Sequence, residues 1–241
     1  TADWSSDYTD KTTPVTVVLA NTGYVESISF VKGACGAIKT INTEVVKNGV
    51  KVTYSASEYA TEYEIYRSTN GGKYEKVGTS LELSFVDTAV ASGKTYTYKV
   101  RGVNPNNTGD FSGTKTISYL AMPKTTATIS KTGFTVKWNK VDGASTYRIY
   151  RAEYVNGKWS SWSKLSDQKA SVTSFADKNV KAGGIYKYTV RALASGGVAS
   201  AYEGTPTLVY LLTPTVKIAN AKGGIKGSWN AVAGAQGYAI Y

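Results

Sequence analysis

A nine-residue interval between an aromatic residue and a tyrosine occurs three times in this 241-residue chain, and it constrains the fold more than any other feature. The three pairs are Tyr54 and Tyr63, Trp138 and Tyr147, and Trp229 and Tyr238. The copies begin 84 and 91 residues apart, which is the size of one small domain and too long for a solenoid repeat. The sequence therefore predicts tandem copies of a single kind of domain.

In two of the copies a second repeated block follows the first along the chain. Asp87 and Asp177 are each followed nine residues later by a run, residues 96–101 and 186–191, in which Tyr and Val alternate with Lys and Arg. Alternation with a period of two is typical of an antiparallel strand with one buried face. Asn-Gly and Gly-Gly turns separate further runs of this kind, and no capped amphipathic helix is evident. The pattern predicts an all-β chain with almost no helix.

Together the two blocks read Trp-x-x-Val-x-Gly-Ala-x-x-Tyr-x-Ile-Tyr-Arg and then Gly-x-x-Tyr-x-Tyr-x-Val-Arg-Ala. They resemble tandem fibronectin type III domains, most closely those of secreted or cell-wall proteins of Gram-positive, often gut-dwelling, bacteria. The resemblance covers about residues 37–241, although the first copy has Tyr54 where Trp is usual and lacks the Gly of the Gly-Ala pair. It implies immunoglobulin-like Greek-key β-sandwiches, each with a tyrosine corner, here Tyr96 and Tyr186.

The register of the repeats predicts the domain boundaries. We expect fibronectin type III domains at residues 37–121 and 122–212, and the first strands only of a third at 213–241. Residues 1–36 form an N-terminal β segment that resembles the end of a preceding domain. The linkers hold two or three residues, which predicts a fixed end-to-end orientation and a stiff rod.

The two terminal segments suggest two alternatives. Either the native protein continues in both directions, or the C-terminal strands of one chain are completed by the N-terminal strands of the next in a head-to-tail contact. Continuation is favoured, because the two segments together are shorter than one repeat.

Composition excludes most catalytic chemistry. The chain has no His, one Cys and one Met, so Ser-His-Asp and Cys-His catalysis, most zinc sites and an internal disulfide are excluded. The acidic residues near the N-terminus lack the spacing of a calcium loop, and no insertion forms a cleft around a pair of acids. We expect no catalytic residue, no metal, no cofactor and no enzymatic activity. The sequence contains no stretch of 18 apolar residues, so it predicts no membrane-spanning helix.

The net charge of +11 is carried by Lys and Arg residues scattered singly along the chain. Such a charge favours weak association with polyanions such as wall polymers and sulfated glycans. Because the chain has no basic helix and no run of five cationic residues, we expect no specific binding to nucleic acid.

Two groups of side chains are candidate contacts for a glycan or polyanion. If Ile149 and Val190 face the core, four side chains project from the opposite face of the same sheet: Arg148, Tyr150, Lys187 and Arg191. Contact between these cations and Tyr could simply stabilise the sheet, or the face could dock a polyanion. Tyr154 and Trp159 fall in an enlarged hairpin and could stack sugar rings or pack on a neighbour. Trp162 is expected in the core.

Two functions fit this reading. In the first, the chain is a non-catalytic extracellular module, a stiff spacer or adhesion stalk of a secreted or cell-wall-attached bacterial protein. In the second, it is a glycan-binding accessory region of a carbohydrate-degrading enzyme. The expected partners are a protein, a glycan or an anionic wall polymer at a cell surface.

Overall fold

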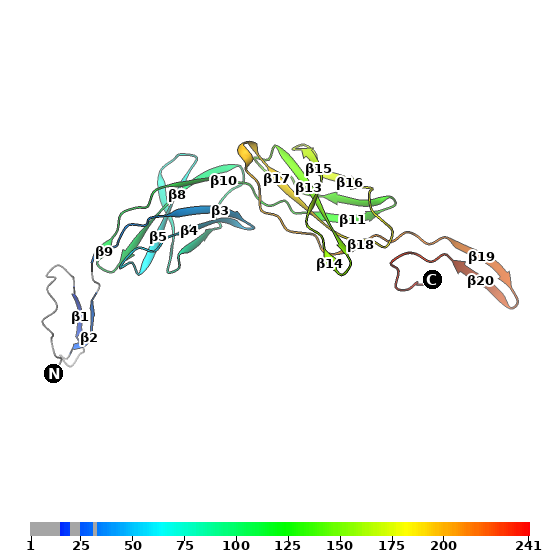
Figure 1. Ribbon diagram of the computed structural model, residues 1–241, viewed down its shortest axis with the longest axis horizontal. Helices are drawn as coiled ribbons and strands as arrows, with labels where there is room; N and C mark the ends of the chain where they lie inside the picture. Colours follow the sequence, from blue (N-terminus) through cyan, green and yellow to red (C-terminus); the bar gives the residue numbers. More distant parts are fainter. Residues whose placement is uncertain (1–14, 20–24, 31–32) are drawn as a thin grey trace. The chain divides into compact units, whose positions relative to one another are not determined.

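The computed structural model describes residues 15–19, 25–30 and 33–241, with side chains from residue 33 onward. The expected all-β class is confirmed: this part of the chain contains strands, no α-helix and a single 3-10 turn, Ser195–Gly197. The described residues divide between residues 119 and 120 into two compact units, with residues 91–93 belonging to the second (Figure 1).

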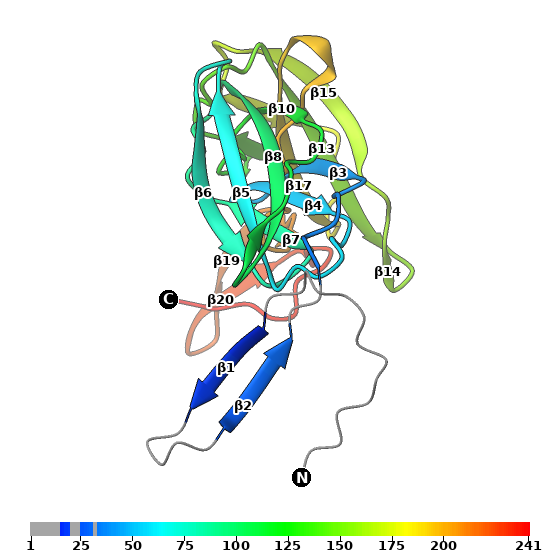
Figure 2. The same cartoon turned by 90° about the vertical axis from the view of Figure 1, so that its left-hand side faces the viewer.

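The first domain consists of two antiparallel sheets. One has the strand order β3-β4-β7 and the other has the order β10-β8-β5-β6, with β9 paired to the end of β8. Figure 2 shows β5, β6 and β8 running side by side in the larger sheet. The strands are β3 (Ile41–Val46), β4 (Gly49–Tyr54), β5 (Glu62–Thr69), β6 (Tyr74–Ser80), β7 (Ser84–Asp87), β8 (Lys94–Asn104), β9 (Asn107–Thr108) and β10 (Lys115–Tyr119).

Alternate residues of these strands form the core of the first domain. In β8 every second residue from Tyr96 to Gly102 is buried, while the residues between them are only partly buried. Because successive side chains of a strand point to opposite faces, this pattern gives the larger sheet one apolar face. The fully buried side chains of this core are Val50, Val52, Ile65, Tyr98 and Val100.

The second domain repeats this arrangement. A sheet of order β11-β12-β16 accompanies a sheet in which β13 and β17 are central, β18 pairs with β17, and β14 and β15 both pair with β13. The strands are β11 (Thr126–Ser130), β12 (Gly133–Lys137), β13 (Thr146–Val155), β14 (Lys158–Trp159), β15 (Ser163–Lys169), β16 (Ser174–Asp177), β17 (Ile185–Leu193) and β18 (Leu208–Val209).

One apolar cluster fills the second domain between its two sheets. Phe134 and Val136 come from β12, while Ile149 and Val190 come from the larger sheet. Ile149 and Val190 are opposite each other in the β13–β17 register, which sets the parity of both strands. Arg148 and Arg191 are therefore on the outer face, away from the core.

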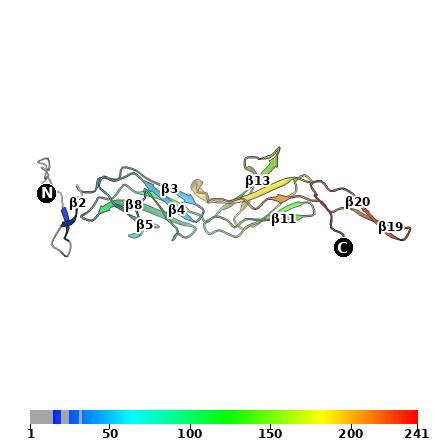
Figure 3. The same ribbon diagram turned by 90° about the horizontal axis from the view of Figure 1, so that it is seen from below.

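Two separate antiparallel pairs complete the described chain. Figure 2 shows β1 (Val15–Leu19) beside β2 (Val25–Phe30), and Figure 3 shows β19 (Val216–Ala221) beside β20 (Gly224–Trp229). Every residue of β19 and β20 is exposed. The domain boundaries expected from the repeats, and the assignment of these pairs to incomplete domains, stay predictions.

Candidate functional site

A buried carboxylate ties the two sheets of the second domain together. Asp177, which is 3% exposed, lies at the end of β16 in the smaller sheet. Its Oδ2 accepts hydrogen bonds from the Tyr188 hydroxyl on β17 at 2.9 Å and from Arg151 Nη1 on β13 at 2.8 Å. Because β13 and β17 belong to the larger sheet, this cluster connects the two layers. We call it the sheet clamp.

The first domain has the same sheet clamp at corresponding positions. Asp87 at the end of β7 accepts from the Tyr98 hydroxyl at 2.9 Å and from Arg67 Nη1 at 2.6 Å. In both domains the other carboxylate oxygen accepts a backbone N–H two residues further on, and the arginine also donates to the backbone oxygen of that residue. Both oxygens of the buried carboxylate are therefore hydrogen-bonded in each copy, as a buried ionic group requires, while Arg151 Nε in the second copy is buried with no hydrogen-bond partner among the described residues.

The environment of the sheet clamp keeps its tyrosines neutral and its arginines charged. Burial, followed by the negative charge of the neighbouring aspartate, raises the pKa of Tyr98 and Tyr188 well above the ordinary tyrosine value. Burial lowers the pKa of Arg67, but the hydrogen bond to Asp87 and its charge outweigh this effect and raise it overall. The arginines also lie over tyrosine rings, Arg67 over Tyr96 at 5.2 Å and Arg151 over Tyr186 at 5.3 Å.

The two tyrosines expected at tyrosine corners both lie against the core. Tyr186 is buried, and its hydroxyl accepts the backbone N–H of Lys181 at 2.9 Å. Tyr96 is buried to the same extent in the first domain. A tyrosine hydroxyl that accepts a backbone N–H a few residues upstream fixes the loop before the strand.

The nine-residue interval has a physical meaning in all three copies. The rings of each pair are in contact, with centroids 5.0, 5.5 and 5.5 Å apart in chain order. In each copy the tyrosine hydroxyl also accepts the backbone N–H of the residue six positions earlier: Ser57, Val141 and Val232. The motif is thus a closed loop, held at one end by ring packing and at the other by a hydrogen bond.

The candidate residues on the outer face of the second domain do not form one group. Tyr150 and Arg191 both line a hollow of about 110 Å³, together with Trp162, Thr189 and Tyr202. Arg148 instead makes two hydrogen bonds to the Asp167 carboxylate, at 2.7 and 3.0 Å. The arginine hydrogen bond, together with one from Lys164, lowers the pKa of Asp167 to about 2.

The remaining candidates gather at the β13–β14 hairpin, which extends beyond the sheet (Figure 3). Tyr154 and Trp159 are opposite each other in the register, with ring centroids 5.3 Å apart. They are 40% and 37% exposed, and the ammonium of Lys187 lies 4.4 Å from the centre of the Trp159 ring. Three of the six candidate contact residues therefore form one exposed aromatic and cationic cluster.

Trp162 is not in the core, so this expectation is wrong. Its ring lies on the outer face, edge-on to Tyr202 with centroids 6.4 Å apart. The physical reason is strand parity: Lys164 is opposite Tyr150, whose side chain is on the outer face, and Trp162 precedes Lys164 by two positions and therefore has the same direction. Tyr202 could not be identified from the periodic pattern, because it lies in the irregular segment between β17 and β18.

The outer face of the first domain is occupied by its own side chains. Glu64 accepts hydrogen bonds from Arg101 Nε and from Lys76 Nζ, each at 2.7 Å, and these contacts lower its pKa. The ammonium of Lys99 lies 4.3 Å from the ring centre of Tyr74 and 3.7 Å from that of Phe111. Cations and rings here stabilise one another, with one carboxylate balancing part of the charge.

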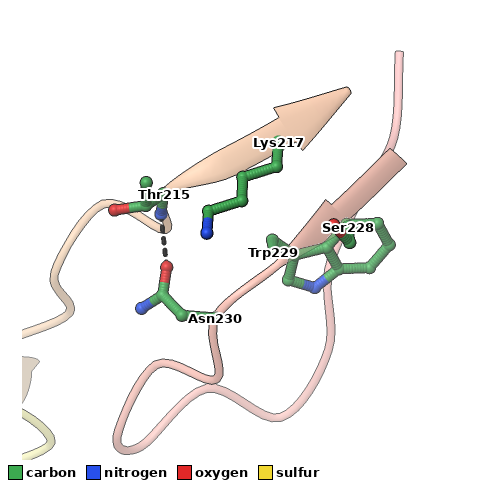
Figure 4. A pocket seen from close by; sticks show the side chains of 5 residues that line it. All are labelled: Thr215, Lys217, Ser228, Trp229 and Asn230. Atoms are coloured by element: carbon green, nitrogen blue, oxygen red, sulfur yellow. Dashed lines mark hydrogen bonds between the residues drawn. The ribbon is translucent and has the colours of Figure 1, made fainter. Parts of the chain in front are cut away.

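A second, more open hollow of about 380 Å³ lies on the C-terminal strand pair (Figure 4). Figure 4 shows Lys217 of β19 and Trp229 of β20 beside it, with the backbone N–H of Thr215 bonded to the Asn230 side chain. Apolar side chains of this pair and of the residues after it line another hollow, among them Val216, Ile218, Ile225 and Ile240. The residues of β19 and β20 that line either hollow are all exposed.

Within the described residues, no group of three or more Cys, Asp or Glu side chains could hold a metal ion. Cys35 is buried, its backbone N–H donates to the Asn107 side chain, and burial raises the pKa of its thiol. No helix in this part of the chain is long and apolar enough to cross a membrane.

No protein-family model matches this chain, and no curated protein matches it. Among solved structures it is similar to a two-domain fibronectin type III segment of chicken tenascin, with 14% identity, 71% of this chain and 98% of that chain covered, and a TM-score of 0.37. It is also similar to the FN1-FN3 domains of chicken CNTN1, with 17% identity, 80% and 76% covered, and a TM-score of 0.35.

The pairing of the strands establishes the fold of the two domains. In each domain a three-stranded antiparallel sheet accompanies a larger antiparallel sheet, with the same pairing of corresponding strands and the same sheet clamp between the layers. The chain therefore contains two fibronectin type III-like β-sandwiches in tandem.

Proposed function

We propose that the chain is a non-catalytic module that acts as a stiff spacer or adhesion stalk of a secreted or cell-surface bacterial protein. The observation that supports this role is the sheet clamp, which is present in both sandwiches with the same donors and acceptors. A spacer has to keep its sheets together when its ends are pulled, and a buried carboxylate that is hydrogen-bonded to side chains of the other layer resists the separation of the two sheets.

Single-molecule force spectroscopy tests this role. The wild-type chain, held by its two ends, should give two unfolding events, one for each sandwich. Asp87→Asn and Asp177→Asn should each lower the unfolding force of one event only. If the unfolding forces of the wild type and of both variants are equally low, the proposal is contradicted.

The stiffness of the spacer is a separate part of the proposal, supported by the short sequence between the two sandwiches. Spin labels on exposed sites of the two domains should give one narrow distance distribution. Insertion of a Gly-Ser segment after Tyr119 should broaden it. If the wild-type distribution is equally broad, the proposed stiffness is contradicted, while the proposed mechanical role of the sheet clamp is not affected.

The cellular part of the proposal is extracellular attachment in a bacterium, with a protein, a glycan or an anionic wall polymer as partner. It is supported by the resemblance of the repeat to domains of secreted Gram-positive proteins. Antibodies against the folded chain should label intact cells of the source organism. Labelling only after the cells are broken would contradict it.

Glycan binding in a carbohydrate-degrading enzyme is a second candidate, favoured by the exposed hairpin rings. Tyr154 and Trp159 present aromatic planes, and the apolar face of a pyranose packs on such planes. A glycan array should then give signals that Trp159→Ala abolishes. Signals that persist in this variant would exclude the hairpin as the binding site.

Head-to-tail association of terminal strands is a further candidate contact, supported by the exposed apolar side chains on β19 and β20. Light scattering should then detect chains that grow with concentration and vanish on deletion of residues 213–241. A strictly monomeric protein would exclude it.

A further inference from the structure

The hollow on the outer face of the second domain is built from several segments. Tyr150 comes from β13, Thr189 and Arg191 from β17, Trp162 from the segment before β15, and Tyr202 from the segment after β17. Three of these five residues are aromatic, one is an arginine, one is a threonine, and none is acidic. Arg191 lies over the Tyr202 ring at 5.1 Å, and its Nε donates to the backbone oxygen of Ser200 at 3.0 Å.

Thr189 supplies an unusual polar group. The residue is 1% exposed, and among the described residues its Oγ1 has no hydrogen-bond partner. Tyr150 is opposite Thr189 in the strand register, so both side chains are on the outer face of the sheet. A buried hydroxyl without a partner costs free energy, and the group is satisfied when a ligand atom reaches it.

In the first domain the corresponding position is filled by a side chain of the domain itself. Corresponding residues of the repeated blocks are Tyr66 and Tyr150, Lys99 and Thr189, and Arg101 and Arg191. In the first domain the Lys99 ammonium lies among the rings, as described above. In the second domain the shorter Thr189 leaves this space open.

A second difference sets the charge that the open space accepts. In the first domain Glu64 binds Arg101 Nε at 2.7 Å. The corresponding residue in the second domain is Arg148, which pairs with Asp167, and Arg191 Nε uses a backbone oxygen instead. Where the first domain has the cation Lys99 and the acid Glu64, the second domain thus has the hydroxyl of Thr189 beside the guanidinium of Arg191. An ammonium ligand is disfavoured there, and an anion is favoured.

We propose that this hollow binds one acidic sugar unit, a hexuronic acid ring within a polysaccharide. The apolar face of the pyranose packs on the aromatic rings, a ring hydroxyl pairs with Thr189 Oγ1, and the carboxylate pairs with Arg191. The volume of about 110 Å³ is well below that of pockets for whole drug-sized ligands, so the site takes part of a single ring. The inference is independent of the spacer role.

Binding is tested on the full chain by NMR titration of the Thr189 and Arg191 amide signals. The probes are oligogalacturonate, a neutral malto-oligosaccharide of the same length and oligoglutamate. Oligogalacturonate should shift these signals, with an affinity that falls as salt is raised, while the other two leave them unchanged. No shift with oligogalacturonate, or an equal shift with either of the other probes, would overturn the proposal.

Variants separate binding from folding. Thr189→Val keeps the shape but removes the hydroxyl, so affinity should fall about three- to tenfold. The melting temperature should not fall, because Oγ1 has no internal partner to lose. Thr189→Lys should close the hollow as Lys99 does in the first domain and abolish binding. Unchanged affinity in both variants would place the site elsewhere and overturn the proposal.

The first domain supplies a matched control. The single change Lys99→Thr opens the corresponding space there but leaves Glu64 in place, so it should create no binding. The double change Lys99→Thr and Glu64→Arg should create a weak second site for oligogalacturonate. Binding by the single variant, with no gain in the double variant, would contradict the role assigned to the charge.

Discussion

Trp138 and Tyr147 pack with their ring centroids 5.5 Å apart, and the Tyr147 hydroxyl accepts the backbone N–H of Val141 at 2.7 Å. The ring contact joins the residue just after β12 to β13, and these strands belong to different sheets. The pair therefore fixes how the chain crosses from one layer to the other, and this explains why the interval between the two residues is constant.

The sheet clamp should be the most sensitive polar feature of each sandwich. Asp177→Asn removes the charge that balances Arg151, and we expect the second domain to lose about 3 kcal/mol of unfolding free energy. Asp87→Asn should do the same to the first domain alone, because the two clusters share no partners. Urea unfolding followed by hydrogen exchange resolves the domains. Asp142→Asn, at an exposed site, is the control and should change little.

The tyrosine corner contributes through one hydrogen bond. Tyr186→Phe leaves the backbone N–H of Lys181 without its partner, and we expect a loss of about 1–2 kcal/mol. An unchanged denaturation midpoint would mean that water satisfies the N–H equally well. Tyr154→Phe, on the exposed hairpin, is the matched substitution and should have no effect.

Gly133 should not tolerate a side chain. Its φ of +144° is rarely adopted by other residues, and a Cβ there would collide with the backbone oxygen of Asp177. Gly133→Ala should therefore lower the melting temperature of the second domain, with scanning calorimetry as the measurement. Gly227→Ala, where a Cβ meets open space, serves as the comparison. Equal effects of the two changes would refute the steric argument.

Alkaline pH should unfold both domains through their sheet clamps. The pKa of Tyr98 and Tyr188 is raised by folding, so the unfolded chain releases these protons first as the pH passes about 10. Stability is therefore fully present below pH 10 and falls above it, by up to about 1.4 kcal/mol per pH unit for each tyrosine. Melting temperatures from pH 8 to 12 measure this, and Tyr188→Phe should flatten the fall for the second domain.

Periodicity was enough to predict the sandwich class and the outward direction of Arg148 and Arg191, because strand parity is a local property. The sheet clamp could not be recognised in this way, although Asp177, Tyr188 and Arg151 all lie in the repeated blocks. Their contact depends on how two sheets are brought together, which no local pattern encodes. Trp162 was misplaced for a related reason: its direction depends on the register between β13 and β15, which the sequence pattern alone does not set.

The closed loop between the paired aromatic residues also bears on folding. A contact that spans nine residues costs little chain entropy to form, so each loop can close before the strands behind it have been synthesised. Neighbouring copies have similar strands, and similar strands in tandem are prone to pair across domains while they fold. Early closure within each copy commits its strands to their own sandwich. The motif that identifies the repeats is thus also suited to keeping them from misassembling with one another.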